Sequence, residues 1–311
     1  MRDQEYDRFG PWVIEISQND PPPPLFLPYL TRSEEPLFSV KIPRTISRRD
    51  ANPGMNLYDY LVTLYGKDIV ILERVGDEVR EHIFPYDEIH YLVLTEELLK
   101  GIVQLGLPDQ IFNLPFNMTS ATTMRYLTDL VRERYAAVEP AISVDAQEPG
   151  LEKGFSNHFD HLLAEQRVGG SSFRFLAGQP DTSIATHEAN PFRKLIFGAA
   201  DKTLMESMHF CDGRELKVIS RGSTFKYRWQ KSYRTDLYTV PVPNIMAIRT
   251  ETDSSNSAIT LLYIETRAGT RSYGFLSNNP TLETYLQLLE PLIQTPSPSS
   301  SLRGKQVAPA A

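Results

Sequence analysis

Two stretches of this chain have the same form, and this repetition is the feature that most limits what the chain can fold into. "SATTMRYLTDLV" (120–131) and "NPTLETYLQLLE" (279–290) each begin with a helix-capping residue and continue with apolar residues at helical spacing. The matched pairs are Ser120 with Asn279, Tyr126 with Tyr285, and Leu127 with Leu286. Because each stretch follows a long series of β-type segments, we expect two copies of one small β-rich unit.

The segments before each helix have the alternation and the turn residues of short strands. In the first copy, turns at 66–68, 76–77 and 107–109 separate apolar-polar runs such as "DIVILERV" and "IHYLVLT"; "LLKGIVQLG" also reads as a strand. In the second copy, "ELKVIS", "DLYTVPV" and "AITLLYIETR" follow the same style. Short strands in close succession predict an antiparallel meander, and the final helix has to bury its apolar stripe against that meander.

The repeat can be tested by its register. "FPYDEI" (84–89) aligns with "VPVPNI" (240–245) at an offset of 156, whereas the Phe before each helix, Phe116 and Phe275, aligns at an offset of 159. The difference, 159 − 156, requires an insertion of three residues. We expect it within "ETDSSNS" (251–257), because loops tolerate insertions.

Length and composition favour a soluble protein of about two domains. The chain has 311 residues, of which 41% are hydrophobic and 23% charged, and no apolar run approaches the length of a membrane span. The N-terminus has no apolar signal region, and Cys211 is the only cysteine, which argues against a disulfide framework. A net charge of −7 makes a nucleic-acid partner unlikely as the default. These features predict a cytoplasmic protein.

Changes in composition suggest the limits of the domains. Residues 1–55 form a leader with short strands and a proline run at 21–24 that reads as a stiff connector. The predicted parts are a first β-rich domain at 56–135, a linker at 136–152, a second domain at 153–293 with a helical extension at its start, and a disordered Ser/Pro-rich tail at 294–311.

A bent antiparallel meander closed by a C-terminal amphipathic helix resembles the pleckstrin-homology (PH)-like fold. The resemblance rests on the strand series, on the "P-x-x-x-I" at 85–89 and 241–245, and on the two final helices. It implies a mainly β (α+β) protein of two tandem PH-like antiparallel β-barrels or bent sheets, each closed by its helix. Classical PH domains have a tryptophan in that helix; Tyr126 and Tyr285 stand at the core positions here, which is more similar to a bacterial-type relative.

The resemblance also implies a function. PH-like domains have no catalytic motif, so it implies non-enzymatic binding or scaffolding, without a cofactor, through a protein partner, self-association or an anionic lipid. Fold alone is a weak argument for function. The ligand is therefore sought among the residues themselves.

A basic and aromatic run in the second copy is the candidate binding segment. "RELKVISRGSTFKYRWQKSYR" (214–234) has one acidic residue, and a strand would place Lys226 and Arg228 on one face and Trp229 on the other. The candidate binding residues are Lys226, Arg228, Trp229, Lys231 and Arg234. Three interpretations stay open: a solvated edge strand kept charged, docking onto the acidic first copy or another protein, and contact with an anionic ligand, as in a peripheral membrane adaptor.

Two histidine arrangements are candidate chemical sites. His158 and His161 lie one helical turn apart, but no third metal ligand or metalloprotease signature accompanies them, so a polar helix face is the preferred interpretation and no metal is expected. His209 and Cys211 lie two apart in a strand, and a packed cysteine is preferred over a nucleophile. The alternative function is an enzyme whose site lies between the domains, around 158–165 and 171–199.

Overall fold

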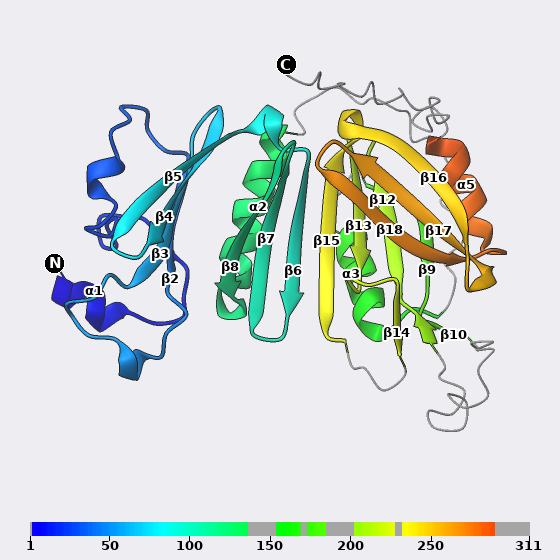
Figure 1. Cartoon of the computed structure of the whole chain (residues 1–311), viewed down its shortest axis with the longest axis horizontal. Coiled ribbons are helices and arrows are strands. Elements are labelled where there is room, and N and C mark those ends of the chain that lie inside the picture. The colour runs from blue at the N-terminus through cyan, green and yellow to red at the C-terminus, as the bar shows by residue number, and fades with distance from the viewer. Residues whose placement is uncertain (1, 136–153, 169–172, 185–201, 228–231, 290–311) are drawn as a thin grey trace, which may run out of the picture.

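The computed structural model describes the chain except for residues 1, 136–153, 169–172, 185–201, 228–231 and 290–311. The described residues form two β-rich units side by side, with the N-terminus on the outer side of the first unit (Figure 1). Antiparallel pairing throughout confirms the mainly β fold class, and the open strand orders of the described sheets make the units bent sheets. The predicted linker and tail lie outside the described residues.

The first unit starts with a sheet of five antiparallel strands in chain order. These strands are β1 (Ile14–Glu15), β2 (Phe38–Pro43), β3 (Tyr58–Leu64), β4 (Asp68–Val75) and β5 (Glu78–Pro85). A 3-10 turn at Tyr86–Glu88 leads to β6 (Tyr91–Glu97), β7 (Lys100–Leu107) and β8 (Gln110–Asn117). After a second 3-10 turn at Met118–Ser120, α2 (Ala121–Tyr135) ends the unit. Apolar residues from β2–β4, β6–β8 and α2 enclose one core.

The residues before β3 cover the outer face of this first sheet and also extend it. Phe9, which follows α1 (Arg2–Arg8), and Phe26, which precedes the 3-10 turn Leu27–Tyr29, are buried against β3 and β4. A further 3-10 turn lies at Arg48–Asp50. β2 falls within the predicted leader, yet it pairs with β3, with Val40 opposite Val62. The first sheet therefore takes one of its central strands from residues 1–55.

The second unit repeats the order of the first. Its first four strands are β9 (Arg174–Gln179), β12 (Ser207–Cys211), β13 (Glu215–Ser220) and β15 (Arg234–Pro241). A 3-10 turn at Val242–Asn244 leads to β16 (Ile245–Asp253), β17 (Asn256–Thr266), β18 (Gly269–Leu276) and α5 (Pro280–Leu289). The additions are α3 (Asn157–Val168) and a small sheet of β10 (Thr182–Ile184), β11 (Lys202–Leu204) and β14 (Phe225–Tyr227).

This shared order is the PH-like arrangement: four strands, a short turn, three strands and a terminal helix. The predicted register is confirmed at the short turn, because the 3-10 turns Tyr86–Glu88 and Val242–Asn244 directly follow Pro85 and Pro241. The three extra residues are also located. Thr252 faces Thr260 whereas Asp253 faces Asn256, so residues 257–259 have no partner on β16. They lie near the start of β17, at the end of the expected segment 251–257. The insertion is therefore an irregularity in the strand and not a longer turn.

The terminal helices confirm the repeat but correct its phase. The Asn279 side chain accepts a hydrogen bond from the Thr281 amide at 2.9 Å, as a cap does, whereas the Ser120 hydroxyl accepts from the Val13 amide at 2.7 Å. Tyr285 is fully buried, but Tyr126 is 53% exposed and so is not a core residue. The buried residues match at an offset of 158, as Met124 with Leu282, Leu127 with Tyr285, and Val131 with Leu289.

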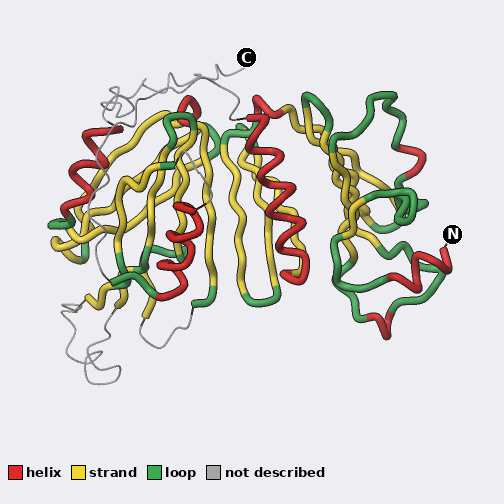
Figure 2. Tube along the Cα trace, turned by 180° about the vertical axis from the view of Figure 1, so that it is seen from behind, coloured by secondary structure: helices red, strands yellow, loops and turns green. Residues whose placement is uncertain are grey.

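One sheet crosses both units. Its strand order, β8-β7-β6-β15-β13-β12-β9, joins three strands of the first unit to four of the second. The β16–β18 sheet lies in front of the second unit's half, and α2 and α3 lie behind (Figure 1); the view from behind shows both helices in front of this sheet (Figure 2). In the described part of the chain, no helix has the length and apolar character needed to cross a membrane.

Candidate functional site: the seam and the surfaces beside it

The seam is the antiparallel pairing of β6 with β15, the only strand pairing between the two units in the described residues. Its register runs from Arg234 opposite Glu97 to Thr239 opposite Leu92. Alternate residues of β6 point to opposite faces of the sheet. As a result Leu92 and Leu94 belong to the first core, whereas Tyr91 and Val93 belong to the second. One strand thus contributes to both hydrophobic cores.

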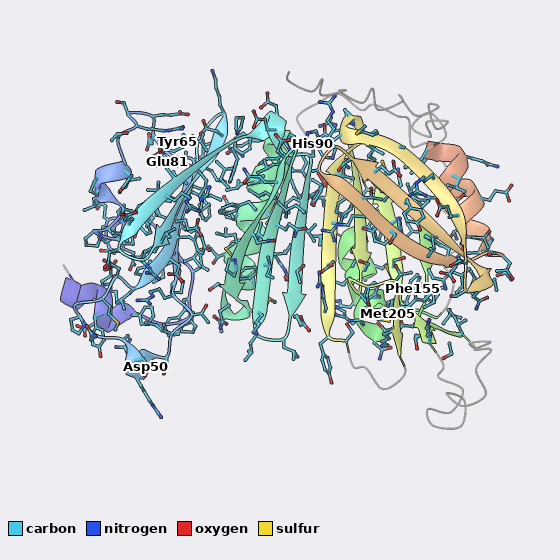
Figure 3. The ribbon with its side chains drawn as sticks, in the orientation of Figure 1. Asp50, Tyr65, Glu81, His90, Phe155 and Met205 are labelled. Atoms are coloured by element: carbon cyan, nitrogen blue, oxygen red, sulfur yellow. The ribbon has the colours of Figure 1, made fainter. Side chains whose placement is uncertain are left out.

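Hydrogen bonds across the seam fix this register. The Thr95 hydroxyl donates to Asp236 at 2.7 Å, and the Tyr135 and Thr239 hydroxyls lie 2.8 Å apart at the end of α2. The Asn244 side chain donates to the Ile89 carbonyl at 3.2 Å, next to His90, which Figure 3 shows at the junction of the units. Buried polar groups that are hydrogen-bonded across the seam specify one relative placement of the units.

A buried ion pair also joins the units. Arg132 on α2 lies 2.9 Å from Glu215 on β13, and the Glu215 side chain is only 2% exposed. Burial raises the pKa of the Glu215 carboxyl, and Arg132 opposes that rise. Lys217 is buried close by, with its ammonium 3.8 Å from the centre of the Phe173 ring, and burial lowers its pKa to about 8. In the Arg132–Glu215 pair the basic residue belongs to the first unit and the acidic residue to the second, which is opposite to the charges in the docking interpretation.

A small polar cavity of 40 Å³ lies inside the second unit, beside the seam. Val93 of β6 lines it together with residues of β12, β13, β15 and β18. Ser207 and Tyr238 line it too, and both hydroxyls are buried without a hydrogen-bond partner among the described residues. Glu206 and Asp236 also line the cavity, but Arg221 and Arg234 hold their carboxylates. The size and polarity of this space suit one or two small polar molecules such as water.

The predicted basic segment is only partly described. Arg228, Trp229 and Lys231 lie outside the described residues. Lys226 is on β14, opposite Thr203 of β11. Arg234 is on β15 and holds Asp236 with two hydrogen bonds of 2.8 Å, so its charge is used inside the seam.

The two histidine arrangements take structural places. His158, on α3, has its Nε2 atom 3.2 Å from the Thr235 hydroxyl, while Phe159 beside it is fully buried against the sheet. His209 is fully buried, with its Nδ1 atom 3.2 Å from the Tyr285 hydroxyl, and burial lowers its pKa to about 3. Cys211 is buried as well, and burial raises its pKa to about 12. A thiol held protonated in this way is a poor nucleophile.

One feature of the surface differs from the sequence expectation. Leu98 and Leu99, expected at the start of a strand, form the two-residue turn between β6 and β7, and they are 67% and 70% exposed. Leu98 has a positive φ of 49°, where Asn or Gly is usual. The sequence does carry a signal for this turn: Glu96 and Glu97 precede the two leucines and Lys100 follows them. Charged residues on both sides mark a solvent-facing hairpin end.

The chain was compared with protein-family models, curated proteins and solved structures. No protein-family model matches the sequence, and no curated protein matches it. Among solved structures, the chain is similar to a DUF1696 family protein with a pleckstrin-homology domain from Shewanella loihica PV-4. The identity is 14% and the TM-score 0.28, with 40% of this chain and 99% of the other covered.

Proposed function

We propose that this chain is a non-enzymatic binding or scaffolding protein in which two PH-like units act as one body. The observation that carries the proposal is the seam: a sheet of seven strands runs through both units, and β6 packs into both cores. Two units joined in this way hold their outer surfaces at a constant distance and angle. Such an arrangement suits a protein that positions partners. Protein partners are the preferred ligands.

The proposal includes a division of the chain. The first unit runs from about β1 to the end of α2, and the second from α3 to α5. The basic residues Lys226, Arg228, Trp229, Lys231 and Arg234 stay a secondary candidate for partner contact.

The test makes the same substitution at a seam position and at an exposed position away from the seam. Thr95→Asp places a carboxylate beside Asp236, to which Thr95 now donates, and the two negative charges should open the seam. Thr250→Asp makes the same change on β16, at an exposed edge position, and serves as the control. Tagged wild type and both variants are expressed in the native host, and the proteins that co-purify are quantified.

We expect wild type and Thr250→Asp to retain the same partners, and Thr95→Asp to lose those that contact both units. Small-angle scattering should show the units moving apart in Thr95→Asp alone. The proposal fails if no protein co-purifies with wild type above a tag-only control, or if Thr95→Asp opens the seam and keeps every partner.

A further inference from the structure

The outer face of β7 and β8 is a sheet surface that the other described residues leave uncovered. In the seven-stranded sheet, the face that carries Tyr238 is covered by β16–β18 in the second unit. The same face continues through Tyr91 and Val93 onto the first unit, but the contact ends where Arg271 of β18 donates to Gln104. In Figure 1 no element lies in front of β7 or β8.

The side chains on this open face are apolar or uncharged. They are Ile102, Gln104, Ile111, Asn113 and Pro115. Ile102 is 37% exposed and Ile111 is 49% exposed, and Gln104 donates to Asn113 at 2.9 Å between them. Charge appears only at the two ends, as Lys100 and as Asp109. Depletion of charge around exposed apolar residues is what distinguishes the centre of a protein interface from ordinary surface.

The Leu98–Leu99 turn extends the open face at its Lys100 end. The repeat offers a direct comparison, because the equivalent turn between β16 and β17 consists of Ser254 and Ser255. The first unit therefore presents two exposed leucines in a turn where the second presents polar residues, and one leucine occupies a backbone region that its side chain disfavours. Exposed apolar residues in such a turn point to contact with another surface.

We infer that a second copy of this chain packs on the open face, a step that rests on the proposed scaffolding function. The whole chain has a net charge of −7, so two copies repel each other wherever charged surfaces meet. The side chains of β7 and β8 at the centre of the open face carry no charge, and the nearest charged group is Arg271 of β18, which contacts Gln104 at the border of the face. Pro115 lies in β8, the edge strand, and cannot donate a backbone hydrogen bond, which disfavours pairing edge to edge and leaves face-to-face stacking.

A two-fold axis gives this contact charge complementarity at its ends. With the axis across the strands, β7 of one copy runs opposite to β7 of the other, so Lys100 of each copy comes to the Asp109 end of its partner. Ile102 and Ile111, which lie toward opposite ends of the face, then meet each other between the copies. Such self-complementary two-fold contacts are the commonest form of oligomer.

Sedimentation velocity of the full chain over a range of concentrations tests this inference. Wild type should sediment as a dimer at high concentration. The double variant Ile102→Arg, Ile111→Arg brings like charges together across the two-fold axis and should weaken association about tenfold or more. Ile83→Arg with Met246→Arg is the matched control, because these residues are 46% and 44% exposed but lie on β5 and β16. The control should remain dimeric.

A turn variant provides a second measurement that is insensitive to misfolding. Leu98→Gly with Leu99→Ser puts a glycine at the first turn position, where the backbone φ is positive at 49°, so the hairpin should form at least as well. Its dimer should still dissociate more readily than that of wild type.

Three outcomes would overturn the inference: a monomeric wild type at every concentration, equal dimers in wild type and the double variant, or equal weakening in the control. Binding of wild type to phosphatidylcholine vesicles that the double variant loses would assign the face to lipid and also overturn it. A monomer that still retains partners in the host leaves the scaffolding function intact, so the two failures are distinguishable.

Discussion

β6 and β15 meet in the seam, whereas β16 and β5 hold the same places in the repeat and stay at outer edges of their sheets. At the offset of 156, Val93 and Leu94 of β6 correspond to Arg249 and Thr250 of β16, and Leu237 and Tyr238 of β15 correspond to Glu81 and His82 of β5. Figure 3 shows Glu81 on the outer part of the first unit, far from the seam.

The difference lies in the side chains, because the backbone order is the same. Joined strands carry apolar residues, and free strands carry charges that oppose further pairing. If a third unit paired in the register of the seam, Glu78 would face Asp253 and His82 would face Arg249, while only Arg80 facing Glu251 would attract. The sheet therefore stops after two units.

The largest effect is expected from giving β6 a residue of its free counterpart. Val93→Arg puts a charge into the second core, where Val93 is 2% exposed, and should lower the free energy of unfolding by at least about 4 kcal/mol. The reciprocal change, Arg249→Val, alters an exposed residue and is the control. Chemical denaturation measures both; equal stability of Val93→Arg and wild type would show that the seam does not need an apolar strand.

A smaller loss of stability is expected from substitutions in the two terminal helices, and it should differ between them. Leu127→Ala should destabilise the protein by about 2–5 kcal/mol, because Leu127 is 1% exposed in the first core. Leu286→Ala should cost less, because Leu286 is only partly buried beside the second core, where Tyr285 and Leu289 hold the central positions. Urea unfolding of the two variants measures the difference, and a larger loss for Leu286→Ala would contradict the corrected phase.

The two cores should also differ in their response to acid. Strand pairing places His209 of the second core where the first has Val62, since His209 faces Val218 and Val62 faces Ile71. The unfolded chain protonates a histidine below a pKa of about 6.5, whereas burial lowers the pKa of His209 to about 3 in the folded chain. Stability is therefore complete above pH 6.5 or so and falls as the pH decreases toward 3, by up to about 1.4 kcal/mol per unit.

Replacing His209 checks this origin. His209→Leu should remove most of the acid-dependent loss between about pH 6.5 and pH 4. Hydrogen exchange should show wild type opening first in the second unit as the pH is lowered. An unchanged pH slope in the variant would assign the acid sensitivity to other groups.

The smallest effect on stability is expected from removing the charges of the free edges. Glu81→Leu with His82→Tyr gives β5 the residues of β15, and Arg249→Val with Thr250→Leu gives β16 those of β6. The four residues are exposed or partly exposed. Each substitution should change the free energy of unfolding by only about 0.5 kcal/mol. Light scattering of the combined variant should reveal chains joined head to tail; particles of the wild-type size would show that something besides charge closes the edges.

The sequence was sufficient for the repeat and for its register. Pro85 and Pro241 each remove a backbone donor at a strand end, so the same short turn follows in both units and the offset is readable. The matched tyrosines predict the wrong helix phase, because the buried stripe of α2 is formed by Met124, Leu127 and Val131. A pattern of buried residues is a better guide to helix phase than a matched pair.

The seam could not be predicted in the same way. Every edge strand has backbone groups without hydrogen-bond partners, and the sequence of β6 does not indicate which strand will pair with it. The apolar character of Tyr91 and Val93 was visible, but a strand buried on both faces is equally consistent with a fully covered position inside one unit. The partner of β6 lies in β15, whose Arg234 was assigned to a binding surface rather than to the seam.

The seam also has a consequence for the order in which this chain is made. β6 leaves the ribosome about 140 residues before β15, which spans Arg234–Pro241. At typical rates of synthesis, on the order of 10 s passes between them. During that interval the edge of β6 lacks its partner strand β15, and Tyr91 and Val93 lack the second core against which they pack. The rest of the first unit is complete once α2 has been made. The nascent chain thus exposes an unpaired strand edge early. A slow codon or a stalled ribosome after residue 135 would prolong the period in which β6 can pair with a neighbouring chain instead of with β15.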